Sequence, residues 1–467
     1  MNCRRIVIAG TRSGAGKTSI ATGLMAALAA RGFKVQGFKV GSDYIDPGYH
    51  TLAAGRPSRN LDTCLMTPDN VLEVFNRAAA GADIAIIEGV MGLYDGHRDD
   101  GSGSTAAIAR LLAAPVLLVV DAASLGQSVA AEVLGYRELD PGLHLAGVIL
   151  NRVSGENHLQ LLRQAVASYT GIPVVGWLRK GALPAFPSRH LGLVPVGEQQ
   201  GLQPVFQELA AAVAGGINLE AVITLAGGSN SLPPGGSQEF AAAARQAGPR
   251  VPLAIARDAA FSFYYQDALD YLEALGAELI YFSPLRDAAI PAAAAGLIIG
   301  GGFPEIYLQA LAANRPLLAD LRRRAAAGMP VYAECGGLMY LTREVTDLED
   351  RTWELAGIVP AVCHMHKRLA GLGYRQAALF SDNLLGRRGD VVRGHEFHYS
   401  MLTGMVPGST PAYTWVAGEN EHHDGYATPA LLASYLHLHF LGNRRAAAGL
   451  LAACRRYARL PCNRGGM

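Results

Sequence analysis

The sequence predicts an α/β protein of two domains, the first built on a doubly wound, mostly parallel sheet. Short, continuous apolar runs alternate with helix-like patterns along most of the chain, as expected for strands that helices cover on both faces. A segment rich in glycine, serine and proline interrupts this alternation at 227–237, and 467 residues exceed what one hydrophobic core usually holds. We therefore expect one domain at 1–224, a linker at 225–250 and a second α/β domain at 251–467.

The predicted strands follow the apolar runs in chain order. In the first domain they lie at 5–9, 35–39, 84–88, 115–121, 145–151 and 173–178. In the second domain they lie at 251–256, 278–282, 296–299 and 329–332. These runs lack the polar alternation of half-exposed strands, which favours a buried parallel sheet in each domain.

The composition argues against several classes of protein. The formal net charge is only +1, so no nucleic-acid-binding surface is indicated. No apolar run is long enough to span a bilayer, and the first residues lead directly into a strand, so we expect neither a membrane span nor a signal peptide. The six cysteines have no paired spacing, which favours reduced thiols in a cytoplasmic protein. The oligomeric state stays open, a homodimer included.

A phosphate-binding loop follows the first predicted strand. Residues 10–18 read GTRSGAGKT and lead into an apolar helix pattern. Gly14 and Gly16 let backbone N–H groups close around phosphate oxygens, as in P-loops. Lys17 supplies positive charge to the β- and γ-phosphates, and Thr18 can ligate Mg²⁺. The strand, loop and helix together predict a site for ATP.

Polar side chains at the ends of other strands are expected to face the same site, because ligands bind at the carboxyl ends of parallel strands. Glu88 ends the third strand and is placed to hold Mg²⁺, directly or through water; Asp43 can do likewise. Lys39 can bind phosphate or a substrate carboxylate. Asn151 can read an adenine edge or simply cap its strand. Asp46 precedes a proline, so a role in the turn has equal weight for it.

The second domain carries a nucleophile elbow. The run at 329–332 is followed by Cys335, and Gly336 then leads into an apolar helix pattern. A thiol at a helix N-terminus meets free N–H groups and the helix dipole, so we expect its thiolate form to be favoured. His437, about a hundred residues further on, is the candidate base.

Seven motifs in this order carry a specific resemblance, at residues 10–18, 39–47, 55–62, 88–96, 300–305, 332–337 and 434–440. Over nearly its whole length the chain resembles the cobyrinic acid a,c-diamide synthases. These are glutamine-dependent amidotransferases that act on acetate side chains of a corrin precursor. The N-terminal part is also similar to the dethiobiotin synthetase branch of P-loop proteins. The loops of that branch share the variation seen here, in which Thr11 stands where the strict P-loop pattern has glycine. The C-terminal part resembles a class I, flavodoxin-like glutaminase domain.

The resemblance implies roles for individual residues of the glutaminase. Cys335 would attack the glutamine amide, and His437 would act as the base. Gly301, Gly302 and the N–H of Gly336 would form the oxyanion hole.

Two departures from the class I pattern concern this machinery. Ala333 replaces a glycine, and His439 stands where the class I glutamate would follow the catalytic histidine. The residue that orients His437 is therefore not identifiable from the sequence, and a Cys–His dyad is the safer prediction. Ser42 also replaces an expected proline.

The resemblance further implies ATP and Mg²⁺ as cofactors, held in the region of Lys17, Thr18, Asp43 and Glu88. ATP would phosphorylate the a- and c-acetate carboxylates of cobyrinate, and ammonia from glutamine would then form the amides. Contact of the tetrapyrrole with Tyr44 and Asp46 is a further expectation.

Other readings stay open. The same motifs would serve hydrogenobyrinate, a nickel sirohydrochlorin or sirohaem as the acceptor. A P-loop switch ATPase of the partitioning type, fused to an inactive amidase-like domain, is the alternative of a different class. Such ATPases usually have lysine in place of Arg12, and they have no need of Cys335 and His437. A dethiobiotin-type synthetase alone would leave the second half of the chain unexplained.

Overall fold

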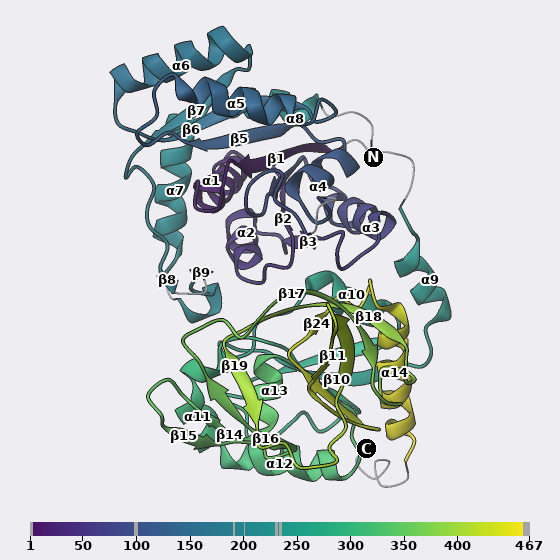
Figure 1. Ribbon diagram of the computed structural model, residues 1–467. Coiled ribbons are helices and arrows are strands. Elements are labelled where there is room, and N and C mark those ends of the chain that lie inside the picture. Colours follow the sequence, from purple (N-terminus) through teal and green to yellow (C-terminus); the bar gives the residue numbers. More distant parts are fainter. Residues whose placement is uncertain are drawn as a thin grey trace. The chain divides into compact units, whose positions relative to one another are not determined.

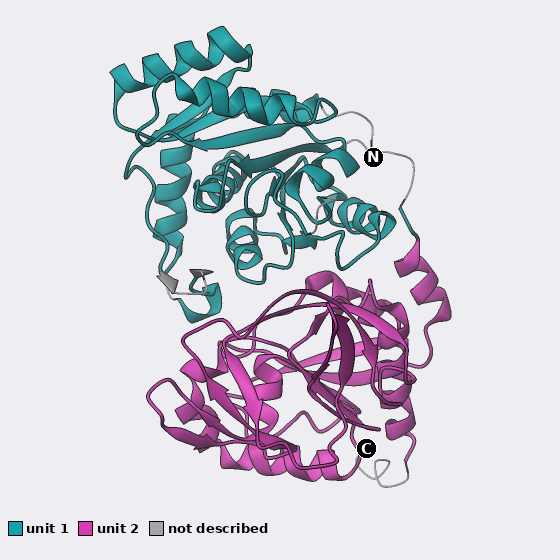
Figure 2. Ribbon diagram, in the orientation of Figure 1, with its two compact units in different colours: residues 1–237 teal, residues 238–467 magenta. Residues whose placement is uncertain are grey.

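The computed structural model describes residues 3–97, 101–189, 192–199, 201–228, 232 and 236–460. It divides into two compact units, residues 1–237 and 238–467 (Figure 2). The division lies within the stretch expected to be a linker, although α9 (Glu239–Gln246) forms a helix there and packs on α10 (Gln266–Ala274). The domain limits drawn from the sequence stay a prediction.

Unit 1 is built on a parallel sheet of seven strands, in the order β3-β2-β4-β1-β5-β6-β7. Its strands are β1 (Arg4–Gly10), β2 (Val35–Val40), β3 (Arg59–Leu61), β4 (Ile84–Glu88), β5 (Val116–Asp121), β6 (Leu145–Val153) and β7 (Val174–Arg179). The predicted apolar runs match six of them closely, whereas β3, with the sequence RNL, was not predicted. The strand order reverses beside β1, and the crevice at such a reversal is where α/β sheets bind ligands.

Helices cover both faces of this sheet (Figure 1). Helices α1, α2 and α7 pack together on one face, and α5 and α6 pack together on the other. The helices of unit 1 are α1 (Lys17–Ala30), α2 (Asp46–Ala54), α3 (Pro68–Ala79), α4 (Thr105–Leu111), α5 (Ser128–Glu138), α6 (Glu156–Thr170), α7 (Gln203–Gly216) and α8 (Leu219–Gly227). Three short elements lie between β7 and α7, namely β8 (Ser188–Arg189), β9 (Gly192–Leu193) and η1 (Val196–Glu198).

The central sheet of unit 2 has six strands in the order β11-β10-β12-β13-β23-β22. They are β10 (Val251–Ala256), β11 (Ala277–Phe282), β12 (Leu297–Ile299), β13 (Val331–Glu334), β22 (Tyr426–Thr428) and β23 (Leu431–Ser434), and only β22 runs antiparallel to its neighbour. Its further helices are η2 (Pro304–Ile306), α11 (Leu308–Ala313), α12 (Arg315–Ala326), α13 (Gly336–Leu341) and α14 (Arg444–Ala458). The α/β class predicted for both halves is confirmed.

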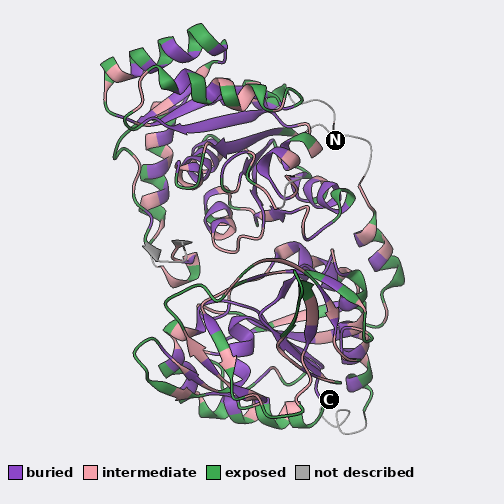
Figure 3. Ribbon diagram, in the orientation of Figure 1, coloured by how far each residue is buried: buried purple, intermediate pink, exposed green. Residues whose placement is uncertain are grey.

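Two smaller sheets in unit 2 were not predicted. One contains β14 (Thr342–Thr346), β15 (Thr352–Glu354), β16 (Val359–Met365) and β19 (Ser400–Thr403). The other contains β17 (Gly371–Leu379), β18 (Val391–His398), β20 (Tyr413–Ala417), β21 (Asn420–Asp424) and β24 (His437–Leu438). Their strands mix buried and exposed positions, whereas those of the central sheets are largely buried (Figure 3). Continuous apolar runs therefore could not reveal them.

In the described part of the chain, no helix combines the length and the apolarity that a bilayer crossing requires.

Candidate active sites of the two units

The P-loop of unit 1 connects the carboxyl end of β1 with the first turn of α1. Gly14 and Gly16 have φ values of +76° and +103°, in the left-handed region that favours glycine. A Cβ on Gly16 would lie 2.3 Å from Nδ2 of Asn151, so the loop packs directly against that side chain. Asn151 in turn donates a hydrogen bond from Nδ2 to the carbonyl of Ala15, at 2.8 Å. The structure thus places Asn151 in support of the loop.

Two basic residues respond differently to burial at this loop. Lys17 donates from Nζ to the carbonyl of Arg12, at 3.0 Å. Burial lowers the pKa of Lys17 to about 8; the charge of Lys39 acts in the same direction, and Glu88 opposes it. Burial also acts to lower the pKa of Lys39, but Asp46 and Glu88 outweigh it and hold the pKa above its ordinary value.

Four predicted residues converge beside the loop. Nζ of Lys39 lies 2.7 Å from both Oδ2 of Asp46 and Oε1 of Glu88. The hydroxyl of Thr18 donates to the same Oε1 of Glu88, at 2.6 Å, and lies 3.3 Å from Oδ2 of Asp46. Asp46 was expected to contact the tetrapyrrole, but its carboxylate faces Thr18 and Lys39 here. Lys39 likewise has both carboxylates as partners.

The two carboxylates beside Lys39 differ in their ease of protonation. Burial acts to raise the pKa of Glu88, but Lys39 and His50 outweigh it, so this pKa lies below its ordinary value. Burial and the charge of Asp43 raise the pKa of Asp46 above its ordinary value, despite Lys39. Glu88 is therefore the carboxylate that stays ionised.

His50 is a member of this cluster that the sequence reasoning missed. Its Nε2 lies 2.6 Å from Oε2 of Glu88, and both side chains are fully buried. His50 follows Asp46 by four residues on α2, which places both on one face of the helix. That spacing was a signal in the sequence.

The two remaining predicted residues of this region lie in the loop before α2. Oδ1 of Asp43 accepts hydrogen bonds from the backbone N–H groups of Ile45 and Asp46, at 2.8 and 3.0 Å. Asp43 thus caps the start of the helix in this structure. Tyr44 is half-buried beside it.

The donor set of this cluster fits Mg²⁺ when a nucleotide supplies further ligands. A hydroxyl and two carboxylates meet there, and oxygen atoms are the ligands Mg²⁺ prefers. Among the described residues, no group of three or more His, Cys, Asp or Glu could hold a metal by itself. Mg²⁺ usually binds through one or two carboxylates together with substrate phosphates, so a complete protein cage is not required.

In unit 2, Cys335 occupies a sharp turn between β13 and α13. Its backbone has φ 49° and ψ −102°, outside the regions that non-glycine residues ordinarily adopt. Its N–H donates to the carbonyl of Ser434 on the neighbouring strand, at 2.7 Å. A strained residue between a strand and a helix is the geometry of a nucleophile elbow, as the sequence predicts.

The expected thiolate form of Cys335 is not supported by its surroundings. Burial raises the pKa of this thiol, and the carboxylate of Glu305 raises it further. The Gly336 N–H acts in the opposite direction but is outweighed. The expectation considered only the helix N-terminus, whereas desolvation of the thiolate dominates. Proton transfer to a base is therefore needed before Cys335 can attack.

The glycines predicted for the oxyanion hole approach the two catalytic candidates. A Cβ on Gly301 would lie 2.5 Å from Cε1 and 3.2 Å from Nε2 of His437. A Cβ on Gly336 would lie 3.2 Å from the backbone nitrogen of Gly302. Larger side chains at Gly301 or Gly336 would clash, so backbone from two loops comes close to the elbow and to His437.

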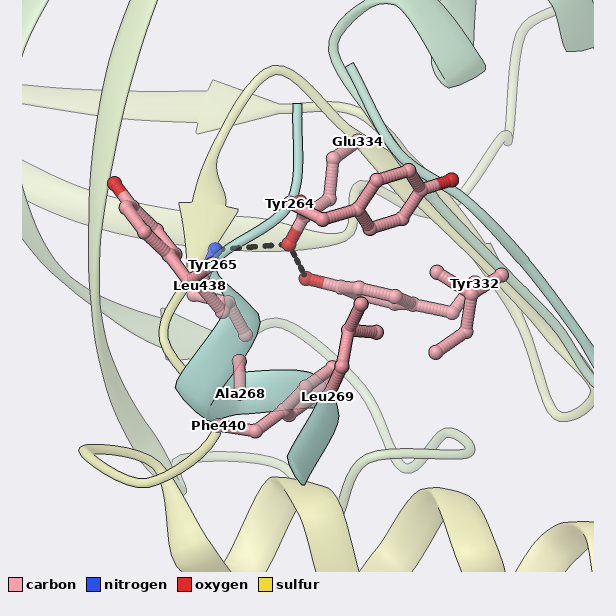
Figure 4. A pocket seen from close by; sticks show the side chains of 9 residues that line it. Tyr264, Tyr265, Ala268, Leu269, Tyr332, Glu334, Leu438 and Phe440 are labelled. Atoms are coloured by element: carbon pink, nitrogen blue, oxygen red, sulfur yellow. Dashed lines mark hydrogen bonds between the residues drawn. The ribbon is translucent and has the colours of Figure 1, made fainter. Parts of the chain in front are cut away.

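His437 has a carboxylate neighbour that the sequence analysis did not identify. Its Nδ1 lies 3.4 Å from Oε2 of Glu334, the residue directly before Cys335. Oε1 of Glu334 accepts hydrogen bonds from the Tyr332 hydroxyl and the Leu438 N–H, at 2.6 and 2.8 Å, and Figure 4 shows this oxygen between them. Tyr332, Glu334 and Leu438 also border a small cavity of about 20 Å³.

His439 is fully buried, and burial lowers its pKa to about 3, so it is neutral at physiological pH. Within the described residues, neither of its ring nitrogens has a hydrogen-bond partner. Its ring lies 5.0 Å from that of Tyr265, between centroids. His439 thus replaces the expected class I glutamate in sequence but provides no negative charge.

A buried polar cluster connects β18 and β19 with the segment that carries His437. The Tyr435 hydroxyl lies 2.8 Å from Oγ of Ser400 and 3.6 Å from Sγ of Cys363. The His398 ring stacks on Tyr435 with centroids 3.7 Å apart. The sequence analysis gave no role to Tyr435, because an aromatic residue between Ser434 and Leu436 indicates no more than a buried segment.

Two family models match the chain, one within each unit. Residues 6–193 match the CobQ/CobB/MinD/ParA nucleotide binding domain, and residues 252–445 match the CobB/CobQ-like glutamine amidotransferase domain. The chain thus carries a nucleotide-binding domain and a glutamine amidotransferase domain.

Relatives match along almost the whole chain. A cobyrinate a,c-diamide synthase from Dehalococcoides mccartyi strain CBDB1 is 45% identical, over 94% of this chain and 96% of its own. One from Priestia megaterium is 41% identical, over 97% and 98%. A hydrogenobyrinate a,c-diamide synthase from Streptomyces coelicolor is 44% identical, over 97% of each chain. The family predicted from the motifs is confirmed: this chain belongs to the cobyrinate a,c-diamide synthase family of glutamine-dependent ligases.

Proposed function

We propose that the protein amidates the a- and c-acetate carboxylates of cobyrinate, with ATP and glutamine as co-substrates. The observation that carries this proposal is the pairing of two sites in one chain. The elbow of Cys335 lies beside the strand that leads to His437. The P-loop brings its Thr18 to Glu88, which also contacts Lys39. The first arrangement suits hydrolysis of an amide, and the second suits transfer of a phosphoryl group.

In unit 2, the thiol of Cys335 would pass its proton to His437 and attack the carboxamide carbon of glutamine. Backbone N–H groups at Gly302 and Gly336 would stabilise the oxyanion. His437 would then protonate the departing nitrogen, which leaves as ammonia, and an acyl thioester remains on Cys335. Water attacks this thioester and releases glutamate, which restores the thiol.

In unit 1, a substrate carboxylate would attack the γ-phosphorus of ATP, forming an acyl phosphate and releasing ADP. Ammonia then displaces phosphate and forms the amide. Lys17 would neutralise the transferring phosphoryl group, while Thr18 and Glu88 would hold Mg²⁺. When bound, Mg²⁺ would supply positive charge that offsets the negative charge of the phosphates.

The other roles in unit 1 are proposals as well. Asp46 and Lys39 contact the metal and phosphate residues, which supports a role there rather than at the tetrapyrrole. Tyr44 stays the candidate contact for the corrinoid. Asp43 would order the loop before α2 and could still reach Mg²⁺ through water. Asn151 would hold the P-loop in place, and it could in addition contact the adenine edge. We also propose a cytoplasmic location and leave a homodimer open.

Hydrogenobyrinate is the second candidate acceptor. The Streptomyces coelicolor relative that is named for this substrate is 44% identical, nearly as similar as the 45% identical cobyrinate enzyme of Dehalococcoides mccartyi. Overall similarity therefore does not separate the two acceptors.

A mass-spectrometric assay tests the proposal. The purified protein with Mg·ATP and glutamine is offered cobyrinate, hydrogenobyrinate and sirohydrochlorin species in parallel, beside the Cys335→Ala variant. We expect two acetates of cobyrinate to become amides, and the variant to need added ammonia. Amidation of only another acceptor would reassign the substrate. ATP hydrolysis without amidation of any acceptor would contradict the proposal and favour a switch ATPase.

A further inference from the structure

In a class I glutaminase, a glutamate two residues after the catalytic histidine provides a negative charge beside its ring. In this chain, a carboxylate at a different position is the candidate for that role. His439 occupies the usual sequence position of that charge, but it is fully buried and neutral, as its lowered pKa requires. A buried imidazole without hydrogen-bond partners among the described residues cannot stabilise a neighbouring imidazolium. A residue other than His439 has to supply this negative charge.

Glu334 has the position that this function needs. It ends β13 and is 7% exposed. Its Oε2 lies 3.4 Å from Nδ1 of His437. This distance exceeds that of a good charge-assisted hydrogen bond, but such contacts are often longer in the absence of substrate.

The rest of the Glu334 carboxylate is held firmly. The Tyr332 hydroxyl and the Leu438 N–H both donate to Oε1, at 2.6 and 2.8 Å. Tyr332 lies two residues earlier on the same strand, hence on the same face of the sheet. Leu438 directly follows His437. Glu334 therefore fixes the backbone beside His437 through Oε1, and its Oε2 faces Nδ1 of the His437 ring.

The contact also defines the role of each nitrogen of His437. A carboxylate at Nδ1 favours the tautomer with its proton on Nδ1. Nε2 is then unprotonated, and its lone pair can accept the proton of Cys335. A Cβ on Gly301 would lie 3.2 Å from Nε2, so this nitrogen is on the side of the glycine loop. The same carboxylate would stabilise the imidazolium formed by the transfer.

We propose that Glu334 is the positioning residue of the glutaminase, completing a Cys335–His437–Glu334 triad from the position next to the nucleophile. The inference rests on the proposed roles of Cys335 and His437. Because Cys335 directly follows Glu334, the last residue of β13, the turn after this strand would present the thiol and the orienting carboxylate together.

The test uses the full-length protein and the pH dependence of kcat/KM for glutamine. We expect Glu334→Gln to lower kcat/KM on the order of 10²-fold or more, as for loss of an orienting carboxylate. The acid limb of the pH profile of kcat/KM should move to lower pH in this variant, because an imidazolium without a neighbouring carboxylate loses its proton more easily. Amidation with added ammonia should stay unchanged. Asp347→Asn is the matched control, since Asp347 is another buried, hydrogen-bonded carboxylate of unit 2.

A second variant covers the case in which Glu334→Gln does not fold. Glu334→Asp keeps the charge but shortens its reach, so we expect a lower kcat with the acid limb in its original place. Activity of Glu334→Gln within threefold of the original, or an original kcat in Glu334→Asp, would overturn the inference. Cys335→Ala distinguishes a failure of the triad from a failure of the proposed glutaminase function. If it abolishes glutaminase activity while Glu334→Gln keeps it, only the triad is refuted; if it keeps that activity, the proposed function fails too.

Discussion

His50 places Nε2 2.6 Å from Oε2 of Glu88, and neither side chain has contact with solvent. The other oxygen of Glu88 accepts from Thr18 and Lys39. One buried carboxylate thus connects α1, β2 and α2 at the carboxyl end of β4. If Glu88 holds Mg²⁺, His50 acts as its outer partner and fixes the orientation of the carboxylate.

Replacement of His50 is therefore expected to weaken Mg²⁺ binding. His50→Leu leaves Oε2 of Glu88 buried without this partner, so we expect about tenfold more Mg²⁺ for half-maximal ammonia-dependent amidation. The free energy of unfolding should also fall by about 1–3 kcal/mol. His50→Gln keeps a hydrogen-bond donor and should recover part of both losses. An unchanged Mg²⁺ requirement in His50→Leu would contradict the role of Glu88 at the metal.

Lys17 is expected to gain a proton when ATP binds at alkaline pH. With its pKa lowered to about 8 by burial, Lys17 is mostly neutral at pH 8.5 in the free protein. Phosphates favour the charged form, so proton uptake should rise from about 0.1 at pH 7 to roughly 0.8 at pH 8.5. Calorimetry in buffers of different ionisation enthalpy measures this uptake.

The control for Lys17 is Lys17→Arg, whose side chain stays charged throughout this range. It should lose the pH-dependent part of the uptake, while the contribution of the ATP phosphates themselves remains. Equal uptake by both proteins at pH 8.5 would show that another group titrates.

Substitution of Gly301 is expected to impair the glutaminase selectively. In Gly301→Ala the new methyl group would lie 2.5 Å from Cε1 of His437, so the imidazole must shift. A misplaced catalytic base costs on the order of 10²-fold in rate, which glutamine hydrolysis measures directly. Gly408→Ala is the matched control, because a Cβ there meets no atom within 4 Å and only the positive φ of 84° is strained. A Gly301→Ala protein as active as the control would remove Gly301 from the site.

His439 predicts an acid-dependent loss of stability in unit 2. Its pKa is lowered to about 3 by burial, whereas an unfolded histidine titrates near 6.5. Between these values the unfolded chain binds more protons, so stability present at neutral pH is lost as the pH falls. The slope is at most about 1.4 kcal/mol per pH unit. His439→Leu should lack this component, as urea unfolding at pH 7 and pH 5 can show; equal losses in both proteins would contradict it.

The sequence predicted most strands of the central sheets, because these strands are largely buried; the short strands β3, β22 and β23 were not predicted. Each such strand, for example β4, is recognisable as a short run of consecutive apolar residues. The elbow at Cys335 was equally accessible, since its strand, nucleophile and glycines are contiguous. The two smaller sheets, which contain β16 and β17, were missed because half-exposed strands have a weaker hydrophobic pattern. Their pairing also depends on contacts between residues distant in sequence.

In the candidate sites too, residues close together in sequence were identified, and residues brought together only by the fold were not. The P-loop residues are local in sequence and were found, whereas Glu334 was not assigned because the glutamate was sought two residues after His437. Only the pairing of β13 with β23 brings Glu334 to that histidine. The burial that raises the pKa of Cys335 is likewise a tertiary effect, which a helix N-terminus alone does not reveal.

The transfer of nitrogen from glutamine through Cys335 tests the central claim most directly. The protein and Cys335→Ala are each given Mg·ATP, cobyrinate, amide-¹⁵N glutamine and unlabelled ammonium, and the products are weighed by mass spectrometry. We predict ¹⁵N in the amides made by the unaltered protein, and only unlabelled amides from Cys335→Ala. Label in the product of Cys335→Ala, or none in that of the unaltered protein, would contradict a glutaminase centred on Cys335.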